Sequence, residues 1–196
     1  MKKYELTGET KQYFGVILLH RIRAVINFGS VKVGDLGGWI EKEENLSHEG
    51  NAWVSDDAWV FGNAKVSGNA WVFGNAWVFG NAKVFGNAKV SGNAKVFGNA
   101  EIYGDAEVRG DAEVFSASHV LVIGAIGSRN DFTTFFRDKG GEITVKCGCF
   151  LGTIDKFLEK VAETHGNSKH ALTYRAAVEL AKLQIELADA EKEKEE

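Results

Sequence analysis

Proline is absent from this 196-residue chain, and cysteine occurs only twice. Without proline, the turns must be built by glycine, asparagine and aspartate, which tolerate positive φ angles. The two cysteines, Cys147 and Cys149, are separated by a single residue, which places them poorly for a structural disulfide. A reducing, cytoplasmic compartment therefore fits the sequence best.

Long apolar runs and an excess of basic charge are also missing. No run of about 18 apolar residues occurs, so we expect no membrane span. The apolar stretch 14–26 is interrupted by His20, Arg21 and Arg23 and does not read as a secretory signal. A net charge of −4 and a pI near 5.8 argue against general nucleic-acid binding.

What the chain has in abundance is a six-residue repeat of the form Gly-Asn-Ala-x-Val-x. A fixed short period is typical of a solenoid, in which each unit packs only on its neighbours. Three units a turn would give an 18-residue coil with three flat sides and a prism roughly 18 Å tall. The aliphatic positions are Val54, Val60, Val66, Val72, Val78, Val84, Val90, Val96, Ile102, Val108 and Val114.

This array resembles the hexapeptide-repeat left-handed β-helix, which implies a three-sided, left-handed parallel solenoid. Together with the segments 34–40 and 123–150, it also resembles β-helical proteins encoded by bacteriophages and prophages. The second resemblance implies the cytoplasm of a bacterial host cell.

Three regions follow: an N-terminal β cap (1–50), the β-helix (51–115) and a small α+β domain (116–196). Ile40 and Leu46 already stand six apart, so the first coil begins there, before a two-residue slip. The last region reads as a strand, a hairpin around residues 138–141 and two helices, with a Lys/Glu tail at 191–196 as a solvated helix end.

The fold class is mainly β. We expect one stripe of the final helix to be buried: Leu172, Ala176, Leu180, Leu183 and Leu187.

Aromatic residues recur every eighteen positions and should stack on the outer faces of the prism. Exposed aromatic columns favour contact with a partner. We expect self-association into a homotrimer, since repeated faces suit symmetric assembly. Alternatives are a cover formed by the N-terminal segment or the C-terminal domain, and a groove for a foreign protein or flat ligand. The interface candidates are Trp59, Phe61, Trp77, Phe79, Phe97 and Phe115 on one side and Trp53, Trp71 and Phe73 on another.

The resembled fold is best known in acyltransferases that use acetyl-CoA or acyl carrier protein and a catalytic histidine. This chain departs from that pattern, because no histidine and no inserted loop occur between residues 51 and 115. The nearest histidines are His48 and His119. Unbroken regularity favours a scaffold, so we name no catalytic residue, metal or cofactor.

A glycine-rich loop with an arginine, 124–131, is the candidate ligand site, the alternative being a structural turn. Its candidate residues are Ser128, Arg129, Asn130 and Asp131, joined by Arg137 across the hairpin. Cys147 and Cys149 lack further ligands at zinc-site spacing. We expect both to be buried like small hydrophobes, with a redox or ligand-contact role as the alternative.

These observations lead us to predict a non-catalytic, oligomeric binding protein of phage type. It would interfere with a host defence system by binding a host protein or by sequestering a nucleotide-like signal. The alternatives are a hexapeptide-repeat acyltransferase that uses acetyl-CoA, and a structural phage component.

Overall fold

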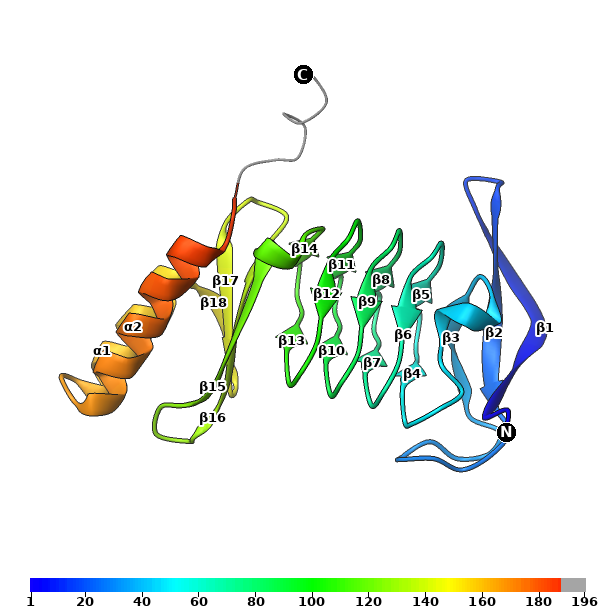
Figure 1. Ribbon diagram of the computed structural model, residues 1–196, viewed down its shortest axis with the longest axis horizontal. Helices are drawn as coiled ribbons and strands as arrows, with labels where there is room; N and C mark the ends of the chain where they lie inside the picture. The colour runs from blue at the N-terminus through cyan, green and yellow to red at the C-terminus, as the bar shows by residue number, and fades with distance from the viewer. Residues whose placement is uncertain (188–196) are drawn as a thin grey trace, which may run out of the picture.

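The computed structural model describes residues 1–187 and shows a hairpin, a stack of short strands and a sheet with two helices, arranged in line (Figure 1). The charged tail that we expected to form a helix end, 191–196, lies outside these residues. Three strands form the N-terminal part: β1 (Tyr4–Tyr13), β2 (Ile17–Ala24) and β3 (Leu36–Ile40), paired antiparallel in that order.

The solenoid begins at β3, which pairs in parallel with β5 (Trp59–Val60) and places Ile40 opposite Val60. Leu46 lies opposite Val66 in the same way, just after a short 3₁₀ helix, η1 (Glu43–Asn45). In each of these two pairs, the paired residues are twenty positions apart in the sequence, instead of the eighteen expected for a regular coil. The predicted start of the first coil and the predicted two-residue slip are thus confirmed.

Each hexad then contributes one two-residue strand, and each strand pairs in parallel with the strand eighteen residues further on. The strands fall into three parallel sheets, and the region is a β-solenoid of about four turns. Besides β5, the strands are β4 (Trp53–Val54), β6 (Lys65–Val66), β7 (Trp71–Val72), β8 (Trp77–Val78), β9 (Lys83–Val84), β10 (Lys89–Val90), β11 (Lys95–Val96), β12 (Glu101–Ile102), β13 (Glu107–Val108) and β14 (Glu113–Val114).

The interior of the solenoid consists of the repeated valines and alanines, which are buried throughout. The corners depend on glycine: Gly62 has φ +68°, and a Cβ there would lie 3.2 Å from the backbone nitrogen of Gly80 in the next coil. Beside the corners, asparagine side chains form hydrogen-bonded ladders along the axis, such as Asn51–Asn69–Asn87–Asp105. The hexad therefore supplies valine and alanine for the core, glycine for the corner and asparagine for the ladder.

The C-terminal unit is an antiparallel sheet of four strands, β15 (Val120–Ile126), β16 (Asp131–Arg137), β17 (Ile143–Cys147) and β18 (Phe150–Thr153), which follow the short η2 (Ala117–His119). Two helices pack against it: α1 (Ile154–His165) and α2 (Lys169–Gln184). The predicted hairpin and the two helices are confirmed. The sheet joins the solenoid where the backbone nitrogen of Glu107 donates to the Thr134 hydroxyl over 3.0 Å.

The predicted buried stripe of α2 is wrong. Leu172 is 58% exposed and Leu183 is 86% exposed, whereas Tyr174 and Val178 are buried. The buried face also carries Ala171, Ala177 and Ala181, and these small side chains let the helix pack closely on the sheet. Leucine spacing alone did not distinguish this face from the opposite one.

Candidate functional site

A cleft of about 470 Å³ lies where the last coils of the solenoid meet the C-terminal sheet. One wall comes from the solenoid around β10 and β13, and the other from β16 and β17. The residues that line the cleft are Asn87, Lys89, Asp105, Glu107, Asp131, Phe132, Thr134, Lys146 and Gly148. Sequence reasoning missed this site because its walls are far apart in the chain.

Both lysines of the cleft pair with the same carboxylate. Glu107 lies 2.7 Å from the Lys146 ammonium and 3.2 Å from the Lys89 ammonium. Partial burial opposes ionisation of Glu107, but the hydrogen bonds and charges of the two lysines outweigh it and lower the pKa of the carboxyl. Lys146 is 8% exposed and also donates to the Gly148 carbonyl. The Glu107–Lys146 pair is therefore a fixed part of the wall.

Two further carboxylates face the cleft from its two walls. Asp105 ends an asparagine ladder, and its Oδ1 accepts from Asn87 Nδ2 over 3.0 Å. Asp131 is exposed at the start of β16, and its Oδ1 accepts from the Phe132 backbone nitrogen over 2.7 Å. Each uses one oxygen in these contacts, which leaves the second for a bound molecule. Three carboxylates against two lysines make the cleft suited to a cationic or hydrogen-donating group.

A second cavity, of about 180 Å³, lies on the C-terminal unit itself, between the 124–131 loop, the β17–β18 turn and α1. It brings two of the predicted ligand residues, Ser128 and Arg129, together with Cys147, Cys149, His165 and Tyr174. The other predicted residues lie elsewhere. Asp131 lines the first cleft, and Asn130 forms a turn by donating its backbone N–H to the Gly127 carbonyl over 3.3 Å.

Arg137 is separated from this loop. It is 4% exposed, its Nη1 lies 3.7 Å from Glu113, and its guanidinium stands 5.0 Å from the Phe115 ring centre. These partners belong to the last coil, so Arg137 fastens the C-terminal sheet to the end of the solenoid.

The expectation that both cysteines are buried is wrong. Cys149 is exposed, and Cys147 is half-buried. The Cys147 sulfur accepts from the Thr133 hydroxyl over 3.3 Å and lies 3.8 Å from the Tyr174 hydroxyl. Burial, followed by the charge of Cys147, raises the pKa of Tyr174 to about 12. The β17–β18 turn displays Cys149, since a turn exposes its central residues.

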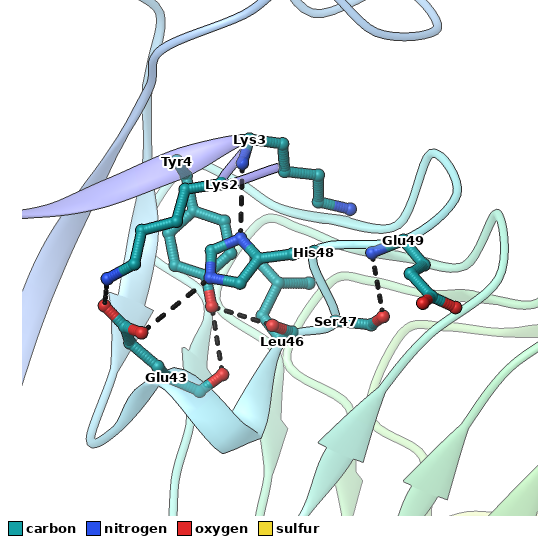
Figure 2. A network of polar contacts seen from close by, with 8 residues as sticks. All are labelled: Lys2, Lys3, Tyr4, Glu43, Leu46, Ser47, His48 and Glu49. Atoms are coloured by element: carbon teal, nitrogen blue, oxygen red, sulfur yellow. Dashed lines mark hydrogen bonds and ion pairs between the residues drawn. The ribbon is translucent and has the colours of Figure 1, made fainter.

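His48 is part of the cap that closes the first coil. Its ring stacks on Tyr4, with 4.3 Å between ring centres, and lies near Glu43 (Figure 2). Its Nδ1 accepts from the Lys3 backbone nitrogen over 3.3 Å, while its Nε2 is buried without a hydrogen bond. Burial lowers the pKa of His48, although Glu43 acts in the opposite direction. Neither nitrogen is presented to a cleft.

His119 closes the other end of the solenoid. It is 2% exposed, its ring meets the Phe115 ring edge-on at 4.1 Å, and its Nδ1 accepts from the Phe115 backbone nitrogen over 3.4 Å. Burial, and next the charge of Arg137, lower its pKa. The two histidines nearest the repeat are therefore packed at its ends.

The aromatic columns stack as the eighteen-residue spacing predicts: ring centres of Trp59 and Trp77 are 4.8 Å apart, and those of Phe61 and Phe79 are 5.0 Å apart. Phe97 and Phe115 continue the second column, and Trp71 and Phe73 lie half-buried on another face. The N-terminal segment covers the first aromatic side chains of these columns. Tyr13 contacts Trp59, Phe61 and Trp77, and Phe28 and Tyr4 cover Trp53. Trp53 and Phe61 are consequently buried within the chain.

Neither a long apolar helix nor a metal-ligand cluster occurs in the described part of the chain. Within residues 1–187, no helix has the length and apolar character needed to cross a membrane. The same residues hold no group of three or more histidine, cysteine, aspartate or glutamate side chains that could bind a metal ion.

Comparison with known proteins gives one informative match and no family model. The chain is similar to the uncharacterized acetyltransferase YdcK of Escherichia coli strain K12, with 38% identity over 63 residues. The match covers 29% of this chain and 19% of the relative, so it spans about a fifth of that protein's length. It overturns our main expectation of a non-catalytic, phage-type binding protein that interferes with a host system. The name of this relative agrees instead with our alternative prediction, a hexapeptide-repeat acyltransferase.

Proposed function

We propose that the protein is an acyltransferase that transfers an acetyl group from acetyl-CoA to an amine in the cleft between the solenoid and the C-terminal sheet. The observation that carries the proposal is the similarity to an acetyltransferase in a chain built as a hexad β-solenoid. The cleft supplies a concave polar site next to the regular coils.

The finer architecture belongs to the same proposal. We take the coils to wind left-handed with three flat sides, as in the hexapeptide-repeat fold that the sequence resembles. Some aromatic side chains of the columns stay half-exposed beyond the N-terminal segment. They would then form the contact surface of a homotrimer: Phe97, Phe115, Trp71 and Phe73.

The acceptor would bind between Asp105 and Asp131. An ammonium group is attracted to the surplus of carboxylates, and the free oxygen of Asp105 lies in the wall beside it. Asp105 takes the proton from the acceptor nitrogen as general base. The nitrogen lone pair then attacks the thioester carbonyl carbon, the C–N bond forms and the C–S bond breaks. The acylated nitrogen gives its remaining extra proton to the departing CoA sulfur, so CoA leaves as the thiol.

Acetyl-CoA supplies the activated thioester when it is bound, but its phosphates do not fit the cleft itself. Lys89 and Lys146 are already paired with Glu107. Within residues 1–187, Lys65 and Lys95 make no ion pair, and both are exposed on outer faces of the solenoid. The Lys95 ammonium lies 5.8 Å from the centre of the Trp77 ring. Exposed lysines that form no ion pair suit the phosphates of the donor. The cleft therefore has to receive only the uncharged acetyl end.

The test is transfer of radiolabelled acetyl groups from acetyl-CoA to a panel of primary amines, measured with the wild type and two matched variants. Asp105 and Asp111 both end asparagine ladders, but Asp111 pairs with Lys139 outside the cleft. We expect Asp105→Asn to lower kcat by about 100-fold or more, the range for loss of a general base. Asp111→Asn should retain activity. Absence of transfer by the wild type to every amine, or equal losses in both variants, would refute the proposal.

A further inference from the structure

The second cavity takes no part in the acyl transfer that we propose for the first cleft, so its own role is still to be assigned. The two hollows lie on opposite sides of the β17–β18 turn, because neighbouring side chains of a strand alternate. Lys146 faces the first cleft, and Cys147 faces the second cavity. The second cavity belongs to the C-terminal unit alone, so its role can be tested separately.

Arg129 provides a cation at this cavity. Within residues 1–187 it has no hydrogen bond and no ion pair, although it lies against the turn. A Cβ at Gly148 would stand only 2.8 Å from Arg129 Nη1, so the glycine, with φ +55°, makes room for the guanidinium. The Arg129 guanidinium therefore lies against the backbone of the turn while its N–H groups are unbonded. Such a group is suited to a planar anion that accepts two hydrogen bonds.

The rest of the lining separates into polar and apolar parts. Lys160 and His165 add nitrogen donors from α1, and the Lys160 ammonium pairs with Glu163 at 3.1 Å on the exposed side of the helix. Phe150, Phe157 and Val161 form an apolar floor, with 5.3 Å between the centres of the two phenyl rings. A cavity with a cationic rim and an aromatic floor matches a molecule with one charged end and one apolar end.

We propose that this cavity binds a small organic anion, with a carboxylate or phosphate against Arg129 and Lys160 and an apolar ring or short chain on Phe150 and Phe157. The volume of about 180 Å³ limits the ligand's size. Pockets for drug-sized ligands measure about 300–1,000 Å³, so the molecule bound here is smaller than such a ligand. Cys149 at the rim serves as a natural reporter, because a bound ligand shields it.

The experiment measures the rate at which iodoacetamide alkylates Cys149, followed by mass spectrometry of the intact full-length chain and of its peptides. In this reaction the thiolate sulfur forms a bond to carbon as the C–I bond breaks and iodide leaves. The added probes are benzoate, phenyl phosphate and the neutral benzyl alcohol. We expect one or both anions to slow alkylation in a saturable way, and the anion that protects better identifies the preferred charged group. Benzyl alcohol should have little effect.

Two variants assign the protection to the cationic rim. Arg129→Gln should weaken protection by about tenfold or more, as expected for loss of a charge-assisted hydrogen bond. Lys160→Gln should weaken it less. Arg109→Gln is the matched control, since Arg109 is also exposed but lies on the solenoid. Equal protection by benzyl alcohol, protection unchanged in Arg129→Gln, or no protection by either anion would overturn the proposal. Amine acetylation is not measured here, so failure of one proposal leaves the other standing.

Discussion

The solenoid and the C-terminal unit bury their apolar residues in different ways. In the solenoid, each valine meets the valine eighteen residues away, and every coil repeats the same contacts. In the C-terminal unit, a four-stranded sheet packs on two helices, and each core residue has its own surroundings. A repeat is thus stabilised by neighbour contacts, whereas the sheet-and-helix unit depends on contacts between distant parts of the chain. The first cleft lies where the repetition ends and the sheet begins.

The two regions can be followed separately during unfolding. All five tryptophans lie between residues 39 and 77, in the cap and the solenoid, and the two α-helices lie in the C-terminal unit. Tryptophan fluorescence therefore reports on the first region, and helical circular dichroism reports on the second.

The largest effect is expected for Val78→Asp in the middle of the solenoid. Val78 is fully buried among valines and alanines, and a carboxylate there would have no partner. An uncompensated buried charge costs about 3–5 kcal/mol. The fluorescence transition should shift to much lower urea or disappear. An unchanged fluorescence midpoint would show that this position is not in a packed interior.

Phe135→Ala should produce a loss of similar size in the other region. Phe135 is fully buried, and its ring meets the Phe157 ring edge-on. Removing a buried phenylalanine side chain costs about 3–5 kcal/mol. We expect the circular dichroism transition to move to lower urea while the fluorescence transition stays close to that of the wild type. Equal shifts in both signals would mean that the two regions unfold as one unit.

A corner glycine should give an intermediate effect. Gly80 has φ +67°, and a Cβ there would lie 3.0 Å from the backbone nitrogen of Gly98. Strain of this kind costs about 1–3 kcal/mol, so Gly80→Ala should lower the fluorescence midpoint. Gly8→Ala is the control, since nothing lies within 4 Å of its Cβ position. The corner argument fails if both variants have the same stability.

The junction between the regions should respond to acid. The pKa of Glu107 is lower in the folded protein than in the unfolded chain, where it is about 4.3. Its stabilising contribution is therefore complete above that value and is lost as the pH falls through the folded pKa. The melting temperature of the wild type should drop more between pH 6 and pH 3 than that of Glu107→Gln. Parallel pH profiles would argue against the Glu107–Lys146 contact.

The smallest effect is expected on the outer face of α2. Leu183 is 86% exposed, so Leu183→Gln should change the free energy of unfolding by less than about 0.5 kcal/mol. Val178→Ala, on the buried face, provides the contrast and should be clearly destabilised in the circular dichroism signal. A larger loss in Leu183→Gln would mean that the leucine face is covered in solution.

The sequence predicted the solenoid in detail because its contacts are fixed by the period. The inward valines, the glycine corners, the stacked rings and the slip before Gly50 all follow from counting in sixes and eighteens. The cover over Trp53 and Phe61 was anticipated only as an alternative. It depends on how β1 and the 25–35 segment fold back, and no repeat encodes that.

The C-terminal unit was predicted in outline only. The hairpin and the helices had local signals, such as Ser168, whose side chain accepts from the Ala171 nitrogen. The buried face of α2 and the exposure of Cys149 depend on non-local packing. The same is true of the first cleft, where Asp105 and Asp131 come from different regions. Of the candidate ligand residues, Ser128 and Arg129 line the second cavity, whereas Arg137 lies beside Glu113 and Phe115 of the last coil.

The most direct test of the account is acetyl transfer by Asp105→Asn, Asp131→Asn and Asp111→Asn, compared at saturating amine and acetyl-CoA. We predict that the first two variants lose most of the turnover and that Asp111→Asn retains it, with all three proteins folded by circular dichroism. Full turnover by the two cleft variants would contradict the placement of acyl transfer between the solenoid and the sheet.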